Sequence, residues 1–74
     1  METEKIIKRE DGSRVRIVTS FTCEYRRNEF RYLSMVQRCG KGKRKWVTDY
    51  DAATKDEIIS AQLELWETIK PKDS

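Results

Sequence analysis

Four cations fall within five consecutive positions near the middle of the chain, in the stretch Arg38-Cys-Gly-Lys-Gly-Lys-Arg-Lys-Trp46. Glycines in such a stretch expose backbone N–H groups, cations contact phosphate oxygens, and an aromatic ring can stack on a base. A basic turn that is only solvated is the alternative interpretation. The predicted anion or nucleic-acid site comprises Arg38, Lys41, Lys43, Arg44, Lys45 and Trp46.

No arrangement for covalent catalysis accompanies the basic stretch. The chain contains no histidine, and its Gly-Lys turn lacks the spacing and the Ser or Thr after Lys that define the phosphate loop of nucleotide hydrolases. Two cysteines cannot supply the four ligands of structural zinc. We therefore expect a protein that is not an enzyme and that needs no metal or other cofactor.

Two long extended segments precede the basic stretch. Apolar and aromatic side chains recur at every second position over residues 15–25, which predicts a half-buried strand. The next run begins at Phe30, and a two-residue turn at Arg27-Asn28 would connect the two. A three-residue loop would reverse the faces of the second strand. The cross-strand charge pairs of the two-residue turn are Glu24 with Arg31 and Arg26 with Glu29.

Hairpin turns are also predicted on either side of this pair of strands. Asp11-Gly12 between extended segments is a strong hairpin signal, and a two-residue turn there pairs Ile6 with Ile17 and Lys8 with Val15. A turn centred on Lys41-Gly42 leads into a fourth strand over residues 46–50, with Val47 beside Val36. In this arrangement the second face of the sheet gathers Ile7, Val18, Leu33, Met35, Trp46 and Tyr50.

A helix follows the strands. Thr54-Lys-Asp-Glu57 has the pattern of a capping box, and Pro71 ends the helical segment that starts at Lys55 and runs to about Lys70. Gln62 falls within the apolar side, where it would bond to a strand edge or mark an interface. The apolar side consists of Ile58, Ile59, Ala61, Leu63, Leu65, Trp66 and Ile69.

These elements predict an α+β fold, a four-stranded antiparallel meander followed by one C-terminal amphipathic helix, in a single small domain over residues 1–74. The sheet covers residues 4–50 and the helix residues 55–70. One helix can cover only one face of such a sheet, so exposed apolar side chains predict a homo-oligomer or a bound partner. The alternative is a strongly twisted sheet that wraps the helix and leaves scattered aromatic residues. The predicted interface residues are Leu33, Met35, Trp46 and Tyr50.

Charge is divided unevenly along the chain. Residues 1–50 carry 13 Lys and Arg against 7 Asp and Glu, whereas residues 51–74 carry 3 against 6. The basic sheet either attracts the acidic helix or presents a face to an anionic partner. We expect no membrane association, since no apolar run approaches the length of a membrane span.

The same features bear on location and redox state. The chain starts without an apolar targeting segment, which predicts a cytoplasmic location. Cys23 and Cys39, which lies opposite Arg16 in the predicted register, fall on opposite faces of the sheet. This placement favours reduced thiols over a disulfide.

The order of elements resembles the small DNA-binding domain at the start of some tyrosine-recombinase integrases, whose sheet enters the major groove. The segments 35–47 and 54–71 are similar to short uncharacterised proteins of bacteriophages and prophages. The second resemblance implies a setting in a bacterial host cell, where small phage proteins commonly bind host machinery, nucleic acid or defence components.

The sequence thus leads to two expectations for function. The first is a small non-enzymatic, phage-borne binding module that contacts nucleic acid through a basic hairpin tip. The second is an oligomeric phage inhibitor or counter-defence protein that blocks a host protein or sequesters a signalling nucleotide.

Overall fold

The computed structural model describes residues 2–24 and 29–69, and it describes their side chains except those of residues 22–24 and 29–31. The order of elements confirms the predicted four-stranded antiparallel meander followed by one helix, with neighbouring strands in the order of the sequence. The elements are β1 (Glu2–Lys8), β2 (Arg14–Glu24), β3 (Glu29–Cys39), β4 (Val47–Thr48), the 3₁₀-helix η1 (Tyr50–Ala52) and α1 (Lys55–Ile69).

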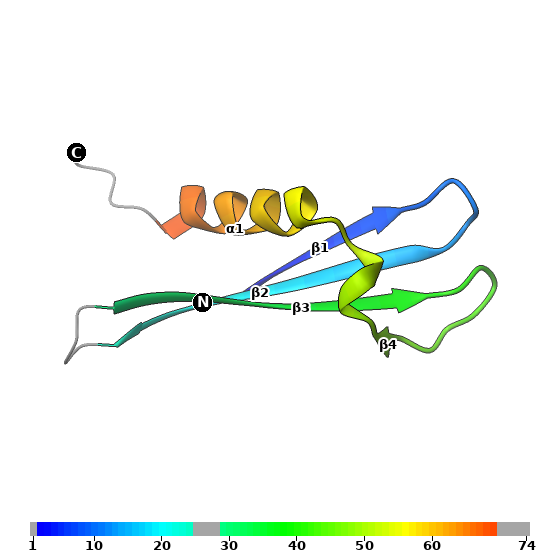
Figure 1. Ribbon diagram of the computed structural model, residues 1–74, viewed down its shortest axis with the longest axis horizontal. Coiled ribbons are helices and arrows are strands. Elements are labelled where there is room, and N and C mark those ends of the chain that lie inside the picture. The colour runs from blue at the N-terminus through cyan, green and yellow to red at the C-terminus, as the bar shows by residue number, and fades with distance from the viewer. Residues whose placement is uncertain (1, 25–28, 70–74) are drawn as a thin grey trace.

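The molecule is elongated, with extents of 44 × 23 × 19 Å, because β2 and β3 form one long hairpin. Helix α1 lies over one face of the sheet, which we call the helix face (Figure 1). The β1–β2 and β3–β4 loops lie at the same end of the molecule, which we call the loop end (Figure 1). Among the described residues no element lies over most of the opposite face, which we call the open face.

The pairing of β2 with β3 keeps the predicted faces but shifts the register by two residues. Ile17 lies opposite Val36, and Thr19 lies opposite Ser34. The predicted register would have placed Arg38 opposite Ile17, which is fully buried. The observed register pairs apolar residues with apolar residues and hydroxyl side chains with hydroxyl side chains. Burial of one such aliphatic side chain stabilises the fold by about 1.5–3 kcal/mol, which outweighs the cross-strand charge pairs on which the prediction was based.

The shift removes the predicted cross-strand charge pair. Glu24 lies opposite Glu29, and Arg31 lies opposite Thr22, so the prediction that Glu24 faces Arg31 was wrong. Because Glu29 lies opposite Glu24, the predicted pair of Arg26 with Glu29 was wrong as well. The predicted Arg27-Asn28 turn lies outside the described residues. Nearer the middle of the hairpin, the rings of the opposed Phe21 and Tyr32 have centroids 5.2 Å apart.

The β1–β2 hairpin closes with a three-residue loop rather than the predicted two-residue turn. The N–H of Gly12 donates to the carbonyl of Arg9 at 3.1 Å, and the N–H of Arg9 donates to the carbonyl of Ser13 at 2.9 Å. Gly12 has a φ of 90°, the left-handed conformation that follows the turn in three-residue hairpin loops. The extra loop residue moves every β1 side chain to the other face of the sheet.

Two ion pairs account for this choice of face. In the observed register Ile7 lies opposite Val15 and packs against the core, whereas Ile6 lies opposite Arg16 on the open face. Lys5 and Arg9 turn toward α1, where Lys5 Nζ lies 2.9 Å from Glu64 Oε1 and Arg9 forms two hydrogen bonds of 2.7 Å with Glu57. The predicted pairs of Ile6 with Ile17 and Lys8 with Val15 were therefore wrong.

Strand β4 contains only two residues instead of the predicted segment 46–50. Val47 lies opposite Arg38, not Val36, and Tyr50 belongs to η1. The side chain of Asp49 accepts a hydrogen bond from the N–H of Asp51 and caps η1. Asp and Asn side chains offer the backbone such local partners in competition with a strand ladder, so the chain leaves the sheet at Asp49.

The core lies between α1 and the centre of the sheet. Thr19 is the one buried polar residue in it among the described residues, and its hydroxyl lies 3.3 Å from that of Ser34, which accepts a hydrogen bond from Gln62 Nε2 at 3.2 Å. The sheet thus provides one hydrogen bond to the amide of Gln62, from a side chain on its helix face rather than from the predicted strand edge. The buried apolar side chains of this core are Val15, Ile17, Val36, Ala61 and Leu65.

Helix α1 buries a narrower stripe than the seven residues predicted. Ala61 and Leu65 are fully buried, and Ile58 and Ile69 are half-buried. The remaining three predicted residues are exposed by 40% or more, because they lie on the flank of α1 beside the stripe that packs on the sheet. These are Ile59, Leu63 and Trp66.

The predicted capping box starts the helix. The N–H of Glu57 donates to Thr54 Oγ1 at 3.2 Å, and Glu57 Oε1 accepts from the N–H of Thr54 at 2.8 Å. The two hydrogen bonds from Arg9, together with the one from the Thr54 N–H, lower the pKa of Glu57 to about 2. One carboxylate therefore closes the helix and connects it to β1 and its loop.

Replacing Thr54 by alanine should lower the free energy of unfolding by about 0.5–2 kcal/mol, because an N-cap hydroxyl is lost. Urea denaturation measures the change. Ser60→Ala is the matched control, since Ser60 is exposed in the middle of α1 and should not be destabilised by alanine. An unchanged midpoint for Thr54→Ala would contradict the capping role.

The Glu57 carboxylate should also make stability depend on pH. Its pKa is lower in the folded state than the ordinary value of 4.5, so its contribution is present above that value and disappears as the pH falls toward 2. Glu57→Gln should therefore be less stable than the wild type at pH 6, and the difference should shrink as the pH is lowered. Thermal unfolding between pH 6 and 2 measures this difference, and a constant gap across that range would contradict it.

Candidate nucleic-acid interface

The basic stretch forms a tight loop at the loop end of the molecule. The N–H of Lys43 donates to the carbonyl of Gly40 at 3.0 Å, which closes a turn with Lys41 and Gly42 at its centre. Gly42 has a φ of 73°, a conformation that glycine adopts without strain. The predicted turn is therefore present, and the side chains of residues 41–45 are all exposed.

Two open-face side chains anchor the far half of this loop. Cys39 Sγ donates to the carbonyl of Lys43 at 2.9 Å, and Arg14 Nη2 lies 3.4 Å from the same carbonyl. Cys39 lies opposite Arg14, not Arg16 as predicted, and it is a free, buried thiol. The loop thus has a defined position relative to β2 and β3.

The other loop at this end supports Lys41. A Cβ atom added to Gly12 would lie 2.8 Å from Lys41 Cδ and 2.9 Å from Lys41 Cγ. The aliphatic part of Lys41 therefore crosses the β1–β2 loop directly over Gly12. In that loop, the hydroxyl and backbone N–H of Ser13 lower the pKa of Asp11, which keeps one negative charge on the side of the loop end nearer the helix.

Trp46 lies over two arginines of the open face. The Cζ atom of Arg16 is 4.4 Å from the ring centroid of Trp46, and that of Arg14 is 5.4 Å away. Gln37 Oε1 accepts hydrogen bonds from both Nε and Nη2 of Arg16, the former at 2.9 Å. Each cation–π contact contributes about 0.5–1 kcal/mol at exposed sites, and together with Gln37 they hold the ring and the guanidinium in place.

Arg38, the first residue of the predicted site, lies on the opposite face from Trp46, although it lines one pocket with Lys41. It lies opposite Val15, on the helix face, and its Nε donates to Asp49 Oδ2 at 2.8 Å. Lys41, Lys43, Arg44 and Lys45 form the loop, and Trp46 lies at its base on the open face. The structure therefore brings together five of the six predicted residues.

The described cations of the sheet and its loops divide into two groups. Those directed to the helix side form ion pairs with carboxylates, namely Lys5 with Glu64, Arg9 with Glu57 and Arg38 with Asp49. In the second group no side chain has a carboxylate partner among the described residues, and its members lie on the open face or in the β3–β4 loop. They are Lys8, Arg14, Arg16, Lys41, Lys43, Arg44 and Lys45.

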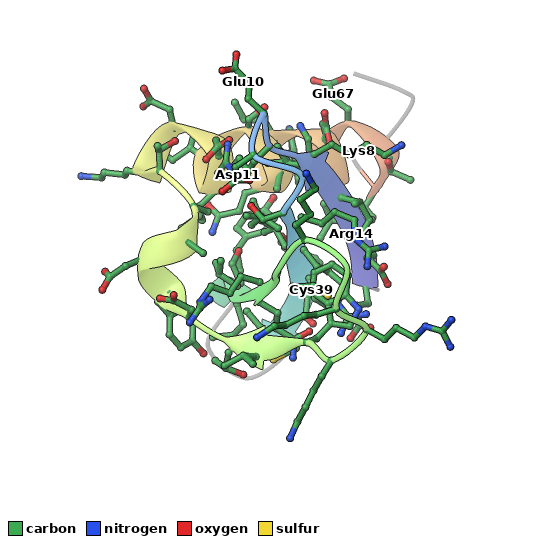
Figure 2. The ribbon with its side chains drawn as sticks, turned by 90° about the vertical axis from the view of Figure 1, so that its right-hand side faces the viewer. Lys8, Glu10, Asp11, Arg14, Cys39 and Glu67 are labelled. Atoms are coloured by element: carbon green, nitrogen blue, oxygen red, sulfur yellow. The ribbon has the colours of Figure 1, made fainter. Side chains whose placement is uncertain are left out.

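Lys8 and Arg14 are directly opposed across the β1–β2 ladder. Figure 2 looks at the loop end and shows both side chains extending to the same side of the molecule. Like charges in directly opposed positions destabilise a sheet. Lys8 and the contact of Gln37 with Arg16 were not predicted from the sequence, because both depend on the strand registers.

The predicted interface residues do not form one patch. Leu33 and Met35 lie on the open face and are 64% and 38% exposed. Trp46 is half-buried against the arginines, and Tyr50 is exposed in η1. Ile6 replaces Ile7 among the apolar side chains of the open face, which follows from the register of β1.

A separate apolar groove lies between α1 and the β2–β3 hairpin. Its volume is about 400 Å³. Sequence periodicity placed the helical half of this groove on the apolar side of α1, but the half from β2 and β3 depends on how the helix lies on the sheet. It is lined by Phe21, Tyr32, Ile59, Gln62, Leu63 and Trp66.

Comparison of the chain with protein-family models, curated proteins and solved structures finds no match. Within the described residues, no helix is both long and apolar enough to cross a membrane. The same residues contain no cluster of three or more His, Cys, Asp or Glu side chains that could hold a metal ion.

Replacing Gly12 by alanine should disturb the loop end. The substitution places a Cβ against Lys41 and forces a positive φ on alanine, so we expect a loss of more than about 1 kcal/mol of stability. Gly40→Ala is the matched control, because its Cβ would meet the nearest atom, Lys43 Cδ, only at 3.4 Å. Urea denaturation of the two variants gives the comparison. Equal stabilities would contradict the packing of Lys41 over Gly12.

Proposed function

We infer that the protein is a non-enzymatic binding module that contacts nucleic acid through the loop end of its open face. The observation that carries this proposal is the segregation of charge. Cations on the helix face of the sheet, Lys5, Arg9 and Arg38, are neutralised by carboxylates, whereas those of the open face and the β3–β4 loop have no carboxylate partner among the described residues. Phosphate contacts by such cations provide most of the sequence-independent affinity for nucleic acid.

The opposed pair of Lys8 and Arg14 supports the proposal. Cations placed side by side on a sheet violate a local rule of strand pairing, and such violations concentrate at functional sites. A phosphate bound between the Lys8 and Arg14 side chains would relieve the repulsion. Gln37 and Trp46 fix the Arg16 guanidinium nearby, so the surface is organised before any ligand arrives.

Apolar surface favours a second candidate function, an oligomeric inhibitor that blocks a host protein or sequesters a signalling nucleotide. The groove of about 400 Å³ beside Trp66 and the exposed Leu33 and Met35 are surfaces that protein partners cover. For this candidate, partner binding should be sensitive to Trp46→Ala or Tyr50→Ala and tolerant of neutralising the loop.

Neutralising the β3–β4 loop tests the proposed function. Glutamine at Lys41, Lys43, Arg44 and Lys45 removes four charges and keeps an aliphatic stem over Gly12. Binding of the wild type to DNA or RNA should weaken linearly in a plot of log affinity against log salt, and the variant should lose about 0.7–0.9 of slope for each phosphate contact removed. Fluorescence anisotropy titrations at several salt concentrations provide the slopes.

Lys55→Gln is the control, because Lys55 is exposed on α1 and forms no ion pair within the described residues. Its slope should equal that of the wild type, and circular dichroism should show that all variants fold. Absence of nucleic-acid binding at low ionic strength, where such contacts are strongest, would overturn the proposal. A molar mass above the 8.8 kDa of one chain would then favour the inhibitor.

A further inference from the structure

The open face combines two kinds of surface. Toward the loop end it carries the cations Lys8, Arg14 and Arg16. Next to them lies an apolar surface, which we call the platform and which consists of Val18, Leu33 and Met35. Val18 lies directly opposite Met35, and Leu33 follows on the same face of β3.

This combination discriminates between forms of nucleic acid. A duplex presents phosphates to a protein surface and keeps the faces of its bases stacked inside, so it rewards cations but not apolar side chains. A single strand offers both its phosphates and its base faces, and bases pack on aromatic and apolar side chains beside a basic groove. Resting on the proposed function, we propose that the open face prefers single-stranded nucleic acid, with bases on the platform and phosphates on the β3–β4 loop.

The geometry around Trp46 supports this arrangement. The ring is held by Arg16, whose Cζ lies 4.4 Å from the ring centroid, and Arg16 is held by Gln37. Side chains that are already immobilised lose little conformational freedom on binding. Trp46 therefore provides a fixed surface at the point where the basic loop meets the platform.

Charge also sets the path of the strand. Glu4 lies opposite Val18 and Glu2 lies opposite Ser20, so the β1 side of the platform is acidic. Phosphates are repelled there. The bound nucleic-acid strand therefore follows β3 from the loop toward Leu33. The six residue steps from Cys39 to Leu33 span about 20 Å.

The experiment compares single strands with duplexes of the same length. The probes are labelled oligothymidine and oligouridine of about 15 nucleotides, within the usual range of single-strand sites, and their duplexes with complementary strands. Anisotropy at low ionic strength should show at least about tenfold tighter binding of a single strand than of its own duplex, which corresponds to about 1.4 kcal/mol.

A platform variant isolates the apolar contribution. Leu33→Ser combined with Met35→Ser leaves the charge unchanged and alters side chains that are already exposed, so the fold should persist. Its affinity for the single strand should fall about fivefold or more, by analogy with the loss of one base contact, while its affinity for the duplex should not change. Leu63→Ser, an equally exposed apolar position on α1, is the control and should bind as the wild type does.

The outcomes separate this inference from the function on which it rests. Equal affinity for single strand and duplex, with no effect of the platform variant, would overturn the preference but leave nucleic-acid binding in place. No binding of any probe would overturn both. A wild type that is a dimer by light scattering and becomes a monomer in the platform variant would show that a second copy covers the platform, which also overturns the inference.

Discussion

The two hydrogen bonds from Arg9 to Glu57 connect the β1–β2 loop to helix α1. Arg9 belongs to the β1–β2 loop, and its Nη2 also donates to the carbonyl of Ala52 in η1 at 3.0 Å. Glu57 lies in the first turn of α1 and closes its capping box. The same contact is made on the helix face, where the odd-numbered residues of β1 lie, and so it stabilises the register that leaves Ile6 and Lys8 on the open face. The composition of the candidate interface therefore depends on an ion pair on the other side of the sheet.

The sequence was sufficient for the kinds of element and their order, because alternation, turn residues and the capping box are local signals. It was not sufficient for registers. For β2 and β3, the predicted and the observed pairings satisfy the same alternation, and only the depth at which Ile17 and Val36 are buried distinguishes them. For β1, Ile6 and Ile7 are equally apolar, and the choice between them depends on carboxylates of a helix about fifty residues away in the chain. Such long-range pairing is not visible in a turn motif.

The members of the candidate site were predictable where they depend on composition. They were not predictable where they depend on which face of the sheet a side chain lies on. Lys41 to Lys45 were found because consecutive cations in a turn are exposed in any register. Arg38 was included for its charge, yet its strand position turns it to Asp49 on the helix face. Gln37 was not noticed, because an amide acquires meaning only when a guanidinium lies beside it.

The shortness of β4 has a consequence for the sheet as a whole. Its ladder with β3 covers Gln37 and Arg38, and one further hydrogen bond reaches Val36 from Asp49. From Glu29 to Met35, no described strand pairs with β3 on the side away from β2. The backbone groups along that margin can accept an added strand from another chain, and unprotected margins of this kind are where cross-chain pairing and aggregation begin. The outer strand at the other margin, β1, carries four charged residues among its seven, which is a protection that the margin of β3 near Leu33 and Met35 lacks.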